Sequence, residues 1–324
     1  MLKYNFNIAD KIKDAKKLST IIEAHNLTKK YNGNTAVEDL SFDINKGEVF
    51  GLLGPNGAGK TTTIRMLCCL ISPSSGTARV GDYDVTDVNG SMKIRKMIGL
   101  VPDNVGLYES LSVVKNLEFF GRMYEAPMQV IKENIEKYLK MLDLWNNRDQ
   151  AVGTFSKGMK QKVAVVRALV HDPDLLIMDE PTANLDPEAA KTIREVILDL
   201  KKDNRTIMLN THNLDEAQRI CDRIGVLKTK LLAIGTPASL ERTMYGRKTE
   251  IIVENINESI LNAVKLEHPL NIEVNGDKMI IETKDPDRDT PSVVSSITAA
   301  GGRIKSVNET RASLEDVYLK LVKE

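Results

Sequence analysis

Short apolar segments alternate with longer helical patterns between residues 23 and 246. The segments "EVFGLLG", "DLLIMDEP" and "RTIMLNTH" are typical of buried strands, because each is an almost unbroken apolar run that ends in polar or glycine residues. Helical stretches such as "KTTTIRMLCCLI" lie between such runs. This alternation favours a parallel α/β core. Since ligands of open α/β sheets gather at the carboxyl ends of the strands, we expect the three polar ends to meet at one edge.

A purely helical pattern interrupts this core. The stretches "LSVVKNLEFFGRMYEA" and "PMQVIKENIEKYLKMLDL" show no strand pattern, and Pro127 fits the first turn of the second helix. The sequence therefore predicts a helical insertion over about residues 107–160.

The periodicity changes after residue 246. The segments "KTEIIVENI", "ESILNAVKLE", "NIEVNGDKMIIET", "PSVVSSITAA" and "GRIKSVNE" predict the order β-α-β-β-α-β, with an Asn-Gly turn inside the hairpin. This order is that of the ferredoxin-like motif, and "SLEDVYLKLVKE" predicts a closing helix. We predict a small α+β domain over 247–324 that senses a ligand, extends a dimer contact or serves as a packing module.

Residues 1–22 form an N-terminal extension with lysines and apolar residues near helical spacing. It fits either a helix on a membrane surface or a solvated helical extension. No apolar run in the chain approaches the roughly 20 residues that cross a bilayer.

Composition narrows the function classes. The chain has 324 residues and a formal net charge of zero, which argues against a nucleic-acid partner. Its three cysteines, at 68, 69 and 221, lack metal-ligand spacing and suit buried thiols in a reducing compartment.

The segment "GPNGAGKTT" at 54–62 carries the clearest chemistry. It satisfies the spacing G-x-x-x-x-G-K-[ST] between a predicted strand and a predicted helix. Such a loop turns its backbone N–H groups toward phosphate oxygens. Lys60 would neutralise the β and γ phosphates and Thr61 would bind Mg²⁺. The predicted nucleotide-binding residues in this loop are Gly54, Asn56, Gly57, Ala58, Gly59, Lys60, Thr61 and Thr62.

Two later strand ends supply candidate partners for this loop. Asp179 could hold Mg²⁺, and Glu180 could orient or deprotonate an attacking water molecule. His212 could reach the γ-phosphate or that water, although a surface or capping role is the alternative. We predict Lys60, Glu180 and His212 as catalytic residues.

The segment "TFSKGMKQK" from residue 154 places a hydroxyl, a glycine and lysines at the start of a predicted helix. Exposed N–H groups at such a start attract anions. Nothing within the segment would hold a nucleotide, so the segment alone leaves open which anion it meets and whether that anion lies on the same chain.

The ordered set Tyr31, "GPNGAGKTT", "FSKGMKQK", "LLIMDEP", "ANLD" and "NTH" resembles the nucleotide-binding subunit of ABC transporters over residues 24–240. The C-terminal "SLEDVYLKLV" is similar to the appended domain of the drug-exporter branch, typified by daunorubicin-resistance ATPases. The resemblance implies a P-loop NTPase, RecA-like core over 23–246 that binds ATP and Mg²⁺.

It also implies a head-to-tail dimer in which each nucleotide lies between one copy's phosphate loop and the other's signature helix. Ser156 and Gly158 would contact the γ-phosphate held by the second copy, and Asp186 would lie near the same junction. Tyr31 would stack on adenine, with an ordinary packed aromatic as the alternative.

Two positions depart from the family pattern. Lys157 replaces a signature glycine, where its charge could help to hold phosphate. Asp103 replaces the usual glutamine; it can still offer an oxygen ligand to Mg²⁺ but is shorter and charged. We expect Asp103 to affect coupling to the membrane partner more than nucleotide binding.

The resemblance leaves two functions to separate. The first is an ATPase that powers an exporter by dimer closure against separately encoded transmembrane permease subunits, at the cytoplasmic face of the cell membrane. The alternative is a soluble ABC-type nucleotide switch without a transport role, whose relatives typically carry two cassettes, coiled-coil arms or zinc cysteines.

Overall fold

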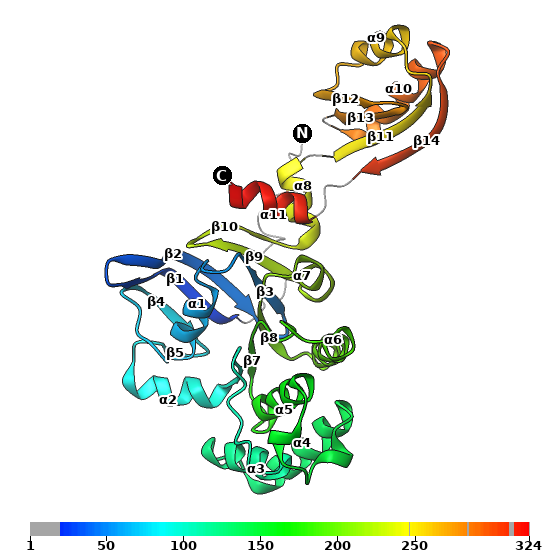
Figure 1. Ribbon diagram of the computed structural model, residues 1–324. Coiled ribbons are helices and arrows are strands. Elements are labelled where there is room, and N and C mark those ends of the chain that lie inside the picture. The colour runs from blue at the N-terminus through cyan, green and yellow to red at the C-terminus, as the bar shows by residue number, and fades with distance from the viewer. Residues whose placement is uncertain (1–19, 246, 284, 311–313, 324) are drawn as a thin grey trace, which may run out of the picture. The chain divides into compact units, whose positions relative to one another are not determined.

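The computed structural model describes residues 20–245, 247–283, 285–310 and 314–323 (Figure 1). The chain divides into two compact units between Leu232 and Ala233. The sequence pattern placed the boundary later, at 246/247. The earlier division follows from α8 (Pro237–Tyr245), which packs against the closing helix α11 (Leu314–Lys323) and so belongs with the C-terminal unit. The predicted N-terminal helical extension lies outside the described residues, apart from the first residues of β1.

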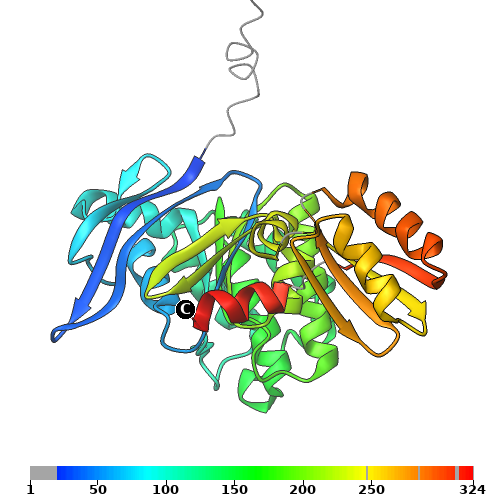
Figure 2. The ribbon, with the colours of Figure 1, turned by 90° about the horizontal axis from the view of Figure 1, so that it is seen from above.

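The larger unit opens with an antiparallel sheet that the sequence pattern did not indicate. Its order is β2-β1-β4-β5, formed by β1 (Thr20–Tyr31), β2 (Asn34–Asn45), β4 (Ser75–Val80) and β5 (Tyr83–Asp84). Figure 2 shows the long β1–β2 hairpin in blue. Register shifts interrupt the pairing of β1 with β2 at several points, so buried and exposed residues do not alternate regularly along β1.

A six-stranded sheet forms the centre of this unit, in the order β10-β9-β3-β8-β7-β6. The strands are β3 (Val49–Leu53), β6 (Ile98–Val101), β7 (Leu175–Asp179), β8 (Thr206–Thr211), β9 (Arg223–Lys228) and β10 (Lys230–Gly235). Strands β6, β7, β8, β3 and β9 run parallel to one another. All residues of β3, β7 and β8 are buried, as expected for strands covered on both faces, and this confirms the three predicted strands.

Helix α1 (Lys60–Leu67) contacts strands of both sheets, and the core between the sheets includes Ile22, Leu40, Phe50 and Leu67. The helix ends four residues earlier than the pattern "KTTTIRMLCCLI" predicts. Cys69 adopts a left-handed backbone with φ 54°, which stops the helix. Helix α2 (Val88–Met97) follows, and α6 (Pro187–Lys202) and α7 (Leu214–Ile220) contact β8.

The predicted helical insertion is present and is larger than expected. It contains α3 (Val113–Met123), α4 (Met128–Met141), two short 3-10 turns and α5 (Lys157–Leu169), which pack against one another. Pro127 occupies the position before α4 rather than its first turn. Helix α5 also packs against β6, so it connects the insertion to the central sheet.

The C-terminal unit has the predicted β-α-β-β-α-β order. It comprises β11 (Arg247–Glu254), α9 (Glu258–Leu266), β12 (Asn271–Asn275), β13 (Lys278–Thr283), α10 (Pro286–Ala299) and β14 (Arg303–Thr310). Its sheet is antiparallel in the order β12-β13-β11-β14, which is the ferredoxin-like arrangement. Ile251, Met279, Val293 and Ile297 are among the residues of its own small core.

In the part of the chain that the structure describes, no helix combines the length and apolar character that a membrane span requires.

Candidate nucleotide site

The loop 54–59 connects the end of β3 to the start of α1. Gly59 precedes the helix with φ 102°, a backbone angle that favours glycine, and a Cβ there would lie 2.4 Å from the Ala36 carbonyl oxygen. No side chain caps the helix start. The first N–H groups of α1 are therefore available to an anion.

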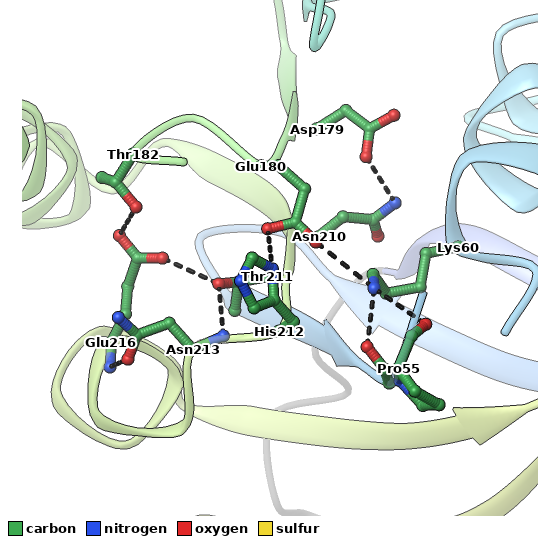
Figure 3. A network of polar contacts seen from close by, with 11 residues as sticks. Pro55, Lys60, Asp179, Glu180, Thr182, Asn210, Thr211, His212, Asn213 and Glu216 are labelled. Carbon is green, nitrogen blue, oxygen red and sulfur yellow. Dashed lines mark hydrogen bonds and ion pairs between the residues drawn. The ribbon is translucent and has the colours of Figure 1, made fainter. Parts of the chain in front are cut away.

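Lys60 is the first residue of α1, and only 6% of its surface is exposed. Its Nζ donates hydrogen bonds to the carbonyl oxygens of Gly54 at 2.6 Å and Pro55 at 3.3 Å. It also forms an ion pair with Glu180 Oε1 at 3.3 Å. The loop that a phosphate would enter thus already holds a buried cation near its centre (Figure 3).

Asp179 is the last residue of β7 and is buried. It accepts hydrogen bonds from Asn210 Nδ2 at 3.2 Å and from the Thr61 hydroxyl. Burial raises the pKa of this carboxyl, the two hydrogen bonds oppose that rise, and the negative charges of Glu180 and Asp103 add to it. A cation placed here would relieve the unfavourable environment of the carboxylate.

Glu180 follows directly with φ 51°, a left-handed backbone that is costly for a residue with a Cβ. Its N–H donates to the Asn210 carbonyl at 3.0 Å, and its own carbonyl accepts from Ala183 N at 3.1 Å. The turn directs the carboxylate between Lys60 and His212, whose Nδ1 lies 2.7 Å from Glu180 Oε2.

These groups face one cavity of about 680 Å³. Its lining brings together twelve of the predicted site residues, Tyr31, Asn56, Gly57, Ala58, Gly59, Lys60, Thr61, Thr62, Asp103, Asp179, Glu180 and His212. Ala36, Pro55, Ala183 and Asn184 also line it and were not predicted. Gly54 does not line the cavity, but its carbonyl holds Lys60.

The other three predicted residues lie outside this cavity. Ser156 caps α5 by accepting a hydrogen bond from Met159 N at 3.3 Å. Asp186 caps α6 in the same way, through Ala189 N at 2.9 Å. A Cβ on Gly158 would lie 2.7 Å from the Cβ of Ala189, so a glycine lets the two helix starts approach closely.

Several polar residues of the site were missed from the sequence. Asn210 and Thr211 lie within the apolar run of β8 and are fully buried, and Glu216 is a buried acid on α7. For Asn210 and Thr211 the only signal was their position as polar residues inside an otherwise apolar strand. That signal does not reveal which groups they meet.

The oxygen-rich end of the cavity suits Mg²⁺. The hydroxyl-bearing Thr61 and the carboxylate-bearing Asp103 and Asp179 line the cavity and offer it oxygen donors. Among the described residues, no group of three or more His, Cys, Asp and Glu side chains is arranged to hold a metal by itself. Mg²⁺ typically takes only one or two carboxylates and completes its shell with phosphates and water.

The fold and the site together define a P-loop nucleotide-binding cassette, and comparisons with known proteins agree. A family model described as ABC transporter matches residues 37–183, and one for the C-terminal domain of DrrA1-3-like ATP-binding proteins matches residues 235–322.

Curated relatives match almost the whole chain. It is 34% identical over 306 residues to the linearmycin resistance ATP-binding protein LnrL of Bacillus subtilis, covering 93% of this chain and 98% of that protein. It is also 34% identical to the Nod factor export ATP-binding protein I of Cupriavidus metallidurans, covering 94% and 98%.

Solved structures match about two thirds of the chain. An ATP-binding subunit of an ABC transporter superposes with a TM-score of 0.64 at 32% identity, covering 69% of this chain and 92% of that one. A dimeric cassette bound to ADP and Pi superposes with a TM-score of 0.61 at 26% identity, covering 66% and 98%. The chain belongs to the ATP-binding subunits of ABC transporters, within their drug-resistance and export branch.

The chain is therefore an ATPase subunit that powers transport together with separate transmembrane subunits. The comparisons support this function and not the alternative of a soluble nucleotide switch.

Proposed function

We propose that two copies of this chain close head to tail around two Mg·ATP molecules and reopen after hydrolysis. The observation that carries the proposal is the separation of the two halves of the site. Lys60, Asp179 and Glu180 face the cavity, whereas Ser156 and Gly158 of the same chain lie outside it. A second copy would supply these two residues to the γ-phosphate.

The phosphate loop and the β7 end hold the nucleotide. The N–H groups at the start of α1 and the Lys60 ammonium bind the β and γ phosphates. Thr61 and Asp179, together with Asp103, would hold Mg²⁺, which would offset phosphate charge when bound. Tyr31 is 41% exposed and lines the cavity, with Lys29 Nζ 5.2 Å from the centroid of its ring, and we assign this ring to stack on adenine.

Glu180 would orient the attacking water and accept its proton. The water oxygen would bond to the γ-phosphorus while the bond from this phosphorus to the β–γ bridging oxygen breaks, so that ADP leaves. The Oε1 atom of this carboxylate pairs with the Lys60 ammonium at 3.3 Å. A γ-phosphate would compete for the same ammonium, which would leave Oε1 free to accept a hydrogen bond from water. His212 remains within hydrogen-bond distance of the other oxygen and holds the carboxylate in place. The same imidazole lines the cavity, and we assign it a contact with the γ-phosphate.

The membrane subunits dock beside the helical insertion. A cavity of about 350 Å³ lies among α2, β6 and α3, and its lining is mostly apolar, with Leu70 and Met123 exposed and Arg95 and Lys96 also present. This surface suits an amphipathic segment of a permease. The subunit then works peripherally, at the cytoplasmic face of the cell membrane.

A buried arginine links this docking surface to the nucleotide cavity. Arg167 of α5 lies over the ring of Phe120, which lines the docking cavity, with 5.0 Å from its guanidinium carbon to the ring centroid. It also donates hydrogen bonds to the carbonyl oxygens of Val105 and Gly106, shortly after Asp103. Movement of the insertion would reach Asp103 by this route.

The direction of transport follows from the relatives, whose names describe resistance and export, and we assign export to this chain. The membrane subunits select the transported substance.

Complementation between two inactive variants tests the shared site. Lys60→Ala chains and Ser156→Ala chains are each expected to hydrolyse ATP poorly. When mixed, they form dimers in which one site combines an intact phosphate loop with an intact Ser156, so phosphate release should rise above that of either variant alone. Full-rate hydrolysis by a strict monomer, or no gain on mixing variants shown to associate, would refute the shared site.

A further inference from the structure

A buried acid lies next to the site but does not line the nucleotide cavity, and the proposed function gives it no role. Glu216 lies on α7, four residues after His212, and is 1% exposed. Each of its carboxylate oxygens accepts a hydrogen bond from a different threonine: Oε1 from Thr182 Oγ1 and Oε2 from Thr211 Oγ1, both at 2.9 Å (Figure 3). A carboxylate is rarely buried this completely without a specific partner.

The two threonines come from the two segments that carry the proposed catalytic groups. Thr182 lies two residues after Glu180, in the segment that leads to Asp186. Thr211 ends β8 and immediately precedes His212. The carboxylate of Glu216 therefore joins the segment of Glu180 to the segment of His212.

The turn around His212 is closed by further bonds of the same network. Asn213 N donates to Thr211 Oγ1 at 3.0 Å, and Glu216 N donates to Asn213 Oδ1 at 3.1 Å. The His212 side chain itself is 54% exposed, so packing does little to fix it. The position of its ring relative to Glu180 depends on how firmly its backbone is held.

Glu180 needs the same support, because its left-handed backbone is stable only where the surroundings enforce it. The bond to Thr182 anchors the chain just beyond this residue. We propose that Glu216 is a positioning residue that fixes the position of Glu180 relative to His212. Through the same contacts it transmits movement of the segment 182–186 to His212.

This proposal rests on the roles proposed for Glu180 and His212. It also implies that dimer closure regulates the positions of these two residues through the segment 182–186. Asp186 caps α6 beside Gly158, the region that would face the second copy. If this segment shifts on dimer closure, Thr182 shifts with it. The hydrogen bonds of Glu216 to Thr182 and Thr211 would then transmit the displacement to the turn at His212. Completion of one site could thereby align the catalytic pair of the same chain.

A purely structural role for a buried acid predicts a different outcome, and Glu48 offers a matched control. Glu48 is also buried, at 7% exposure, and accepts hydrogen bonds from Asn45 N at 2.8 Å and Arg223 Nη1 at 3.2 Å. It does not line the nucleotide cavity. Removing either acid should lower stability, but only Glu216 should affect turnover at saturating ATP.

The test compares kcat and KM for ATP hydrolysis by the full chain, at a temperature where each variant is folded by circular dichroism. Glu216→Ala should lower kcat about 10²-fold, the scale expected when reacting groups move by about 1 Å, with little change in KM or ATP affinity. The glutamine of Glu216→Gln can still accept a hydrogen bond from one threonine hydroxyl and donate a hydrogen bond to the other. This variant should therefore keep kcat within about fivefold of the unmodified chain.

Two smaller variants keep the proposal testable if Glu216→Ala does not fold. Thr182→Val and Thr211→Val each remove one of the two bonds while keeping the side-chain shape. We expect each to lower kcat, and the double variant to lower it by less than the product of the two single effects. Multiplicative effects of the two would indicate that the threonines act independently and would contradict a link through Glu216.

Other outcomes separate this inference from the proposed function. If Glu180→Gln abolishes turnover while Glu216→Ala and both threonine variants retain full kcat, the positioning role fails and the catalytic assignment stands. Equal losses of kcat in Glu216→Ala and Glu48→Ala would also overturn it, because they would indicate general destabilisation. Full activity of Glu180→Gln would instead overturn the catalytic assignment itself.

Discussion

The starts of α1 and α5 both carry features that attract anions. They differ in whether the chain itself satisfies the N–H groups exposed there. Helix α1 begins after Gly59 without a side-chain cap, and its first residue, Lys60, is buried beside the cavity. Helix α5 begins after Ser156, whose hydroxyl already accepts a hydrogen bond from Met159 N. The first start leaves its N–H groups to a ligand, and the second satisfies one of them within the chain.

Their surroundings differ in the same sense. Around α1, the carboxylates of Asp103, Asp179 and Glu180 and the imidazole of His212 line one cavity. Around α5, Gly158 packs against the start of α6, and neither Ser156 nor Gly158 lines that cavity. A helix start is thus a complete anion site only when the tertiary structure surrounds it with complementary groups. We infer that α5 becomes one only against a second copy.

The largest expected effect tests whether the chemistry belongs to the α1 side. Glu180→Gln should lower ATP turnover by about 10²–10⁴-fold, the usual contribution of a general base, because the amide cannot accept a proton. ATP should remain bound, and the chain should accumulate as a dimer. Phosphate release and gel filtration measure the two results.

The control for this change is Glu195→Gln, which alters an exposed acid paired with Lys191 on α6. It should leave turnover unchanged. Normal turnover in Glu180→Gln would contradict the assignment of the base.

The next effect concerns the far end of α5. His171 follows this helix, stacks on Tyr124 with ring centroids 3.8 Å apart, and directs Nε2 toward the Ile98 carbonyl at 3.3 Å. Burial lowers its pKa from 6.5 to about 4. Below pH 6.5 the unfolded chain takes up a proton that the folded chain does not, so the free energy of unfolding should fall between pH 6.5 and 4 by up to about 3 kcal/mol.

Urea unfolding at a series of pH values measures this loss. His171→Phe keeps the stacking and removes the titrating group, so its stability should depend less steeply on pH over the same interval. Identical pH dependence in the two chains would show that other groups cause the acid sensitivity.

Lys60→Ala should then weaken ATP binding. Charge-assisted hydrogen bonds are worth roughly 1.5–3 kcal/mol, which corresponds to about a 10- to 150-fold higher dissociation constant. Fluorescence titration with an ATP analogue measures the change. Lys191→Ala, which removes an exposed lysine from α6, should bind ATP normally; equal affinities in both variants would remove Lys60 from the binding site.

The smallest effect separates the two roles of Ser156. Ser156→Ala should lower stability by about 1 kcal/mol through the lost helix cap. Ser112→Ala is the matched control, because Ser112 caps α3 through Lys115 N at the same distance of 3.3 Å. Both variants should lose similar stability in urea unfolding, but only Ser156→Ala should also lose turnover.

The sequence predicted the parts of the molecule that are written in short, local patterns. The phosphate loop could be placed because the spacing of Gly54, Gly59 and Lys60 is itself the structural requirement of a strand–loop–helix turn. The strands β3, β7 and β8 were visible as apolar runs, and the C-terminal β-α-β-β-α-β order followed from simple changes of period. The comparisons confirm the predicted family and ATPase function.

Other parts could not be predicted because they depend on irregular or long-range pairing. Bulges in β1 hide its alternation, so the antiparallel sheet was missed. The boundary between the units depends on α11 returning to pack on α8, a contact between segments about 70 residues apart. No pattern within a short segment of the sequence predicts such a contact.

The amino-acid sequence by itself determined which chemical groups the chain carries and how short segments turn, because backbone preference and hydrophobic period act over a few residues. Only the tertiary structure decided which groups meet. It brought Glu180 between Lys60 and His212, buried Glu216 between two threonines, and left Ser156 outside the cavity of its own chain. Hydrogen bonds and ion pairs act only between groups in contact, and those contacts join residues far apart in sequence.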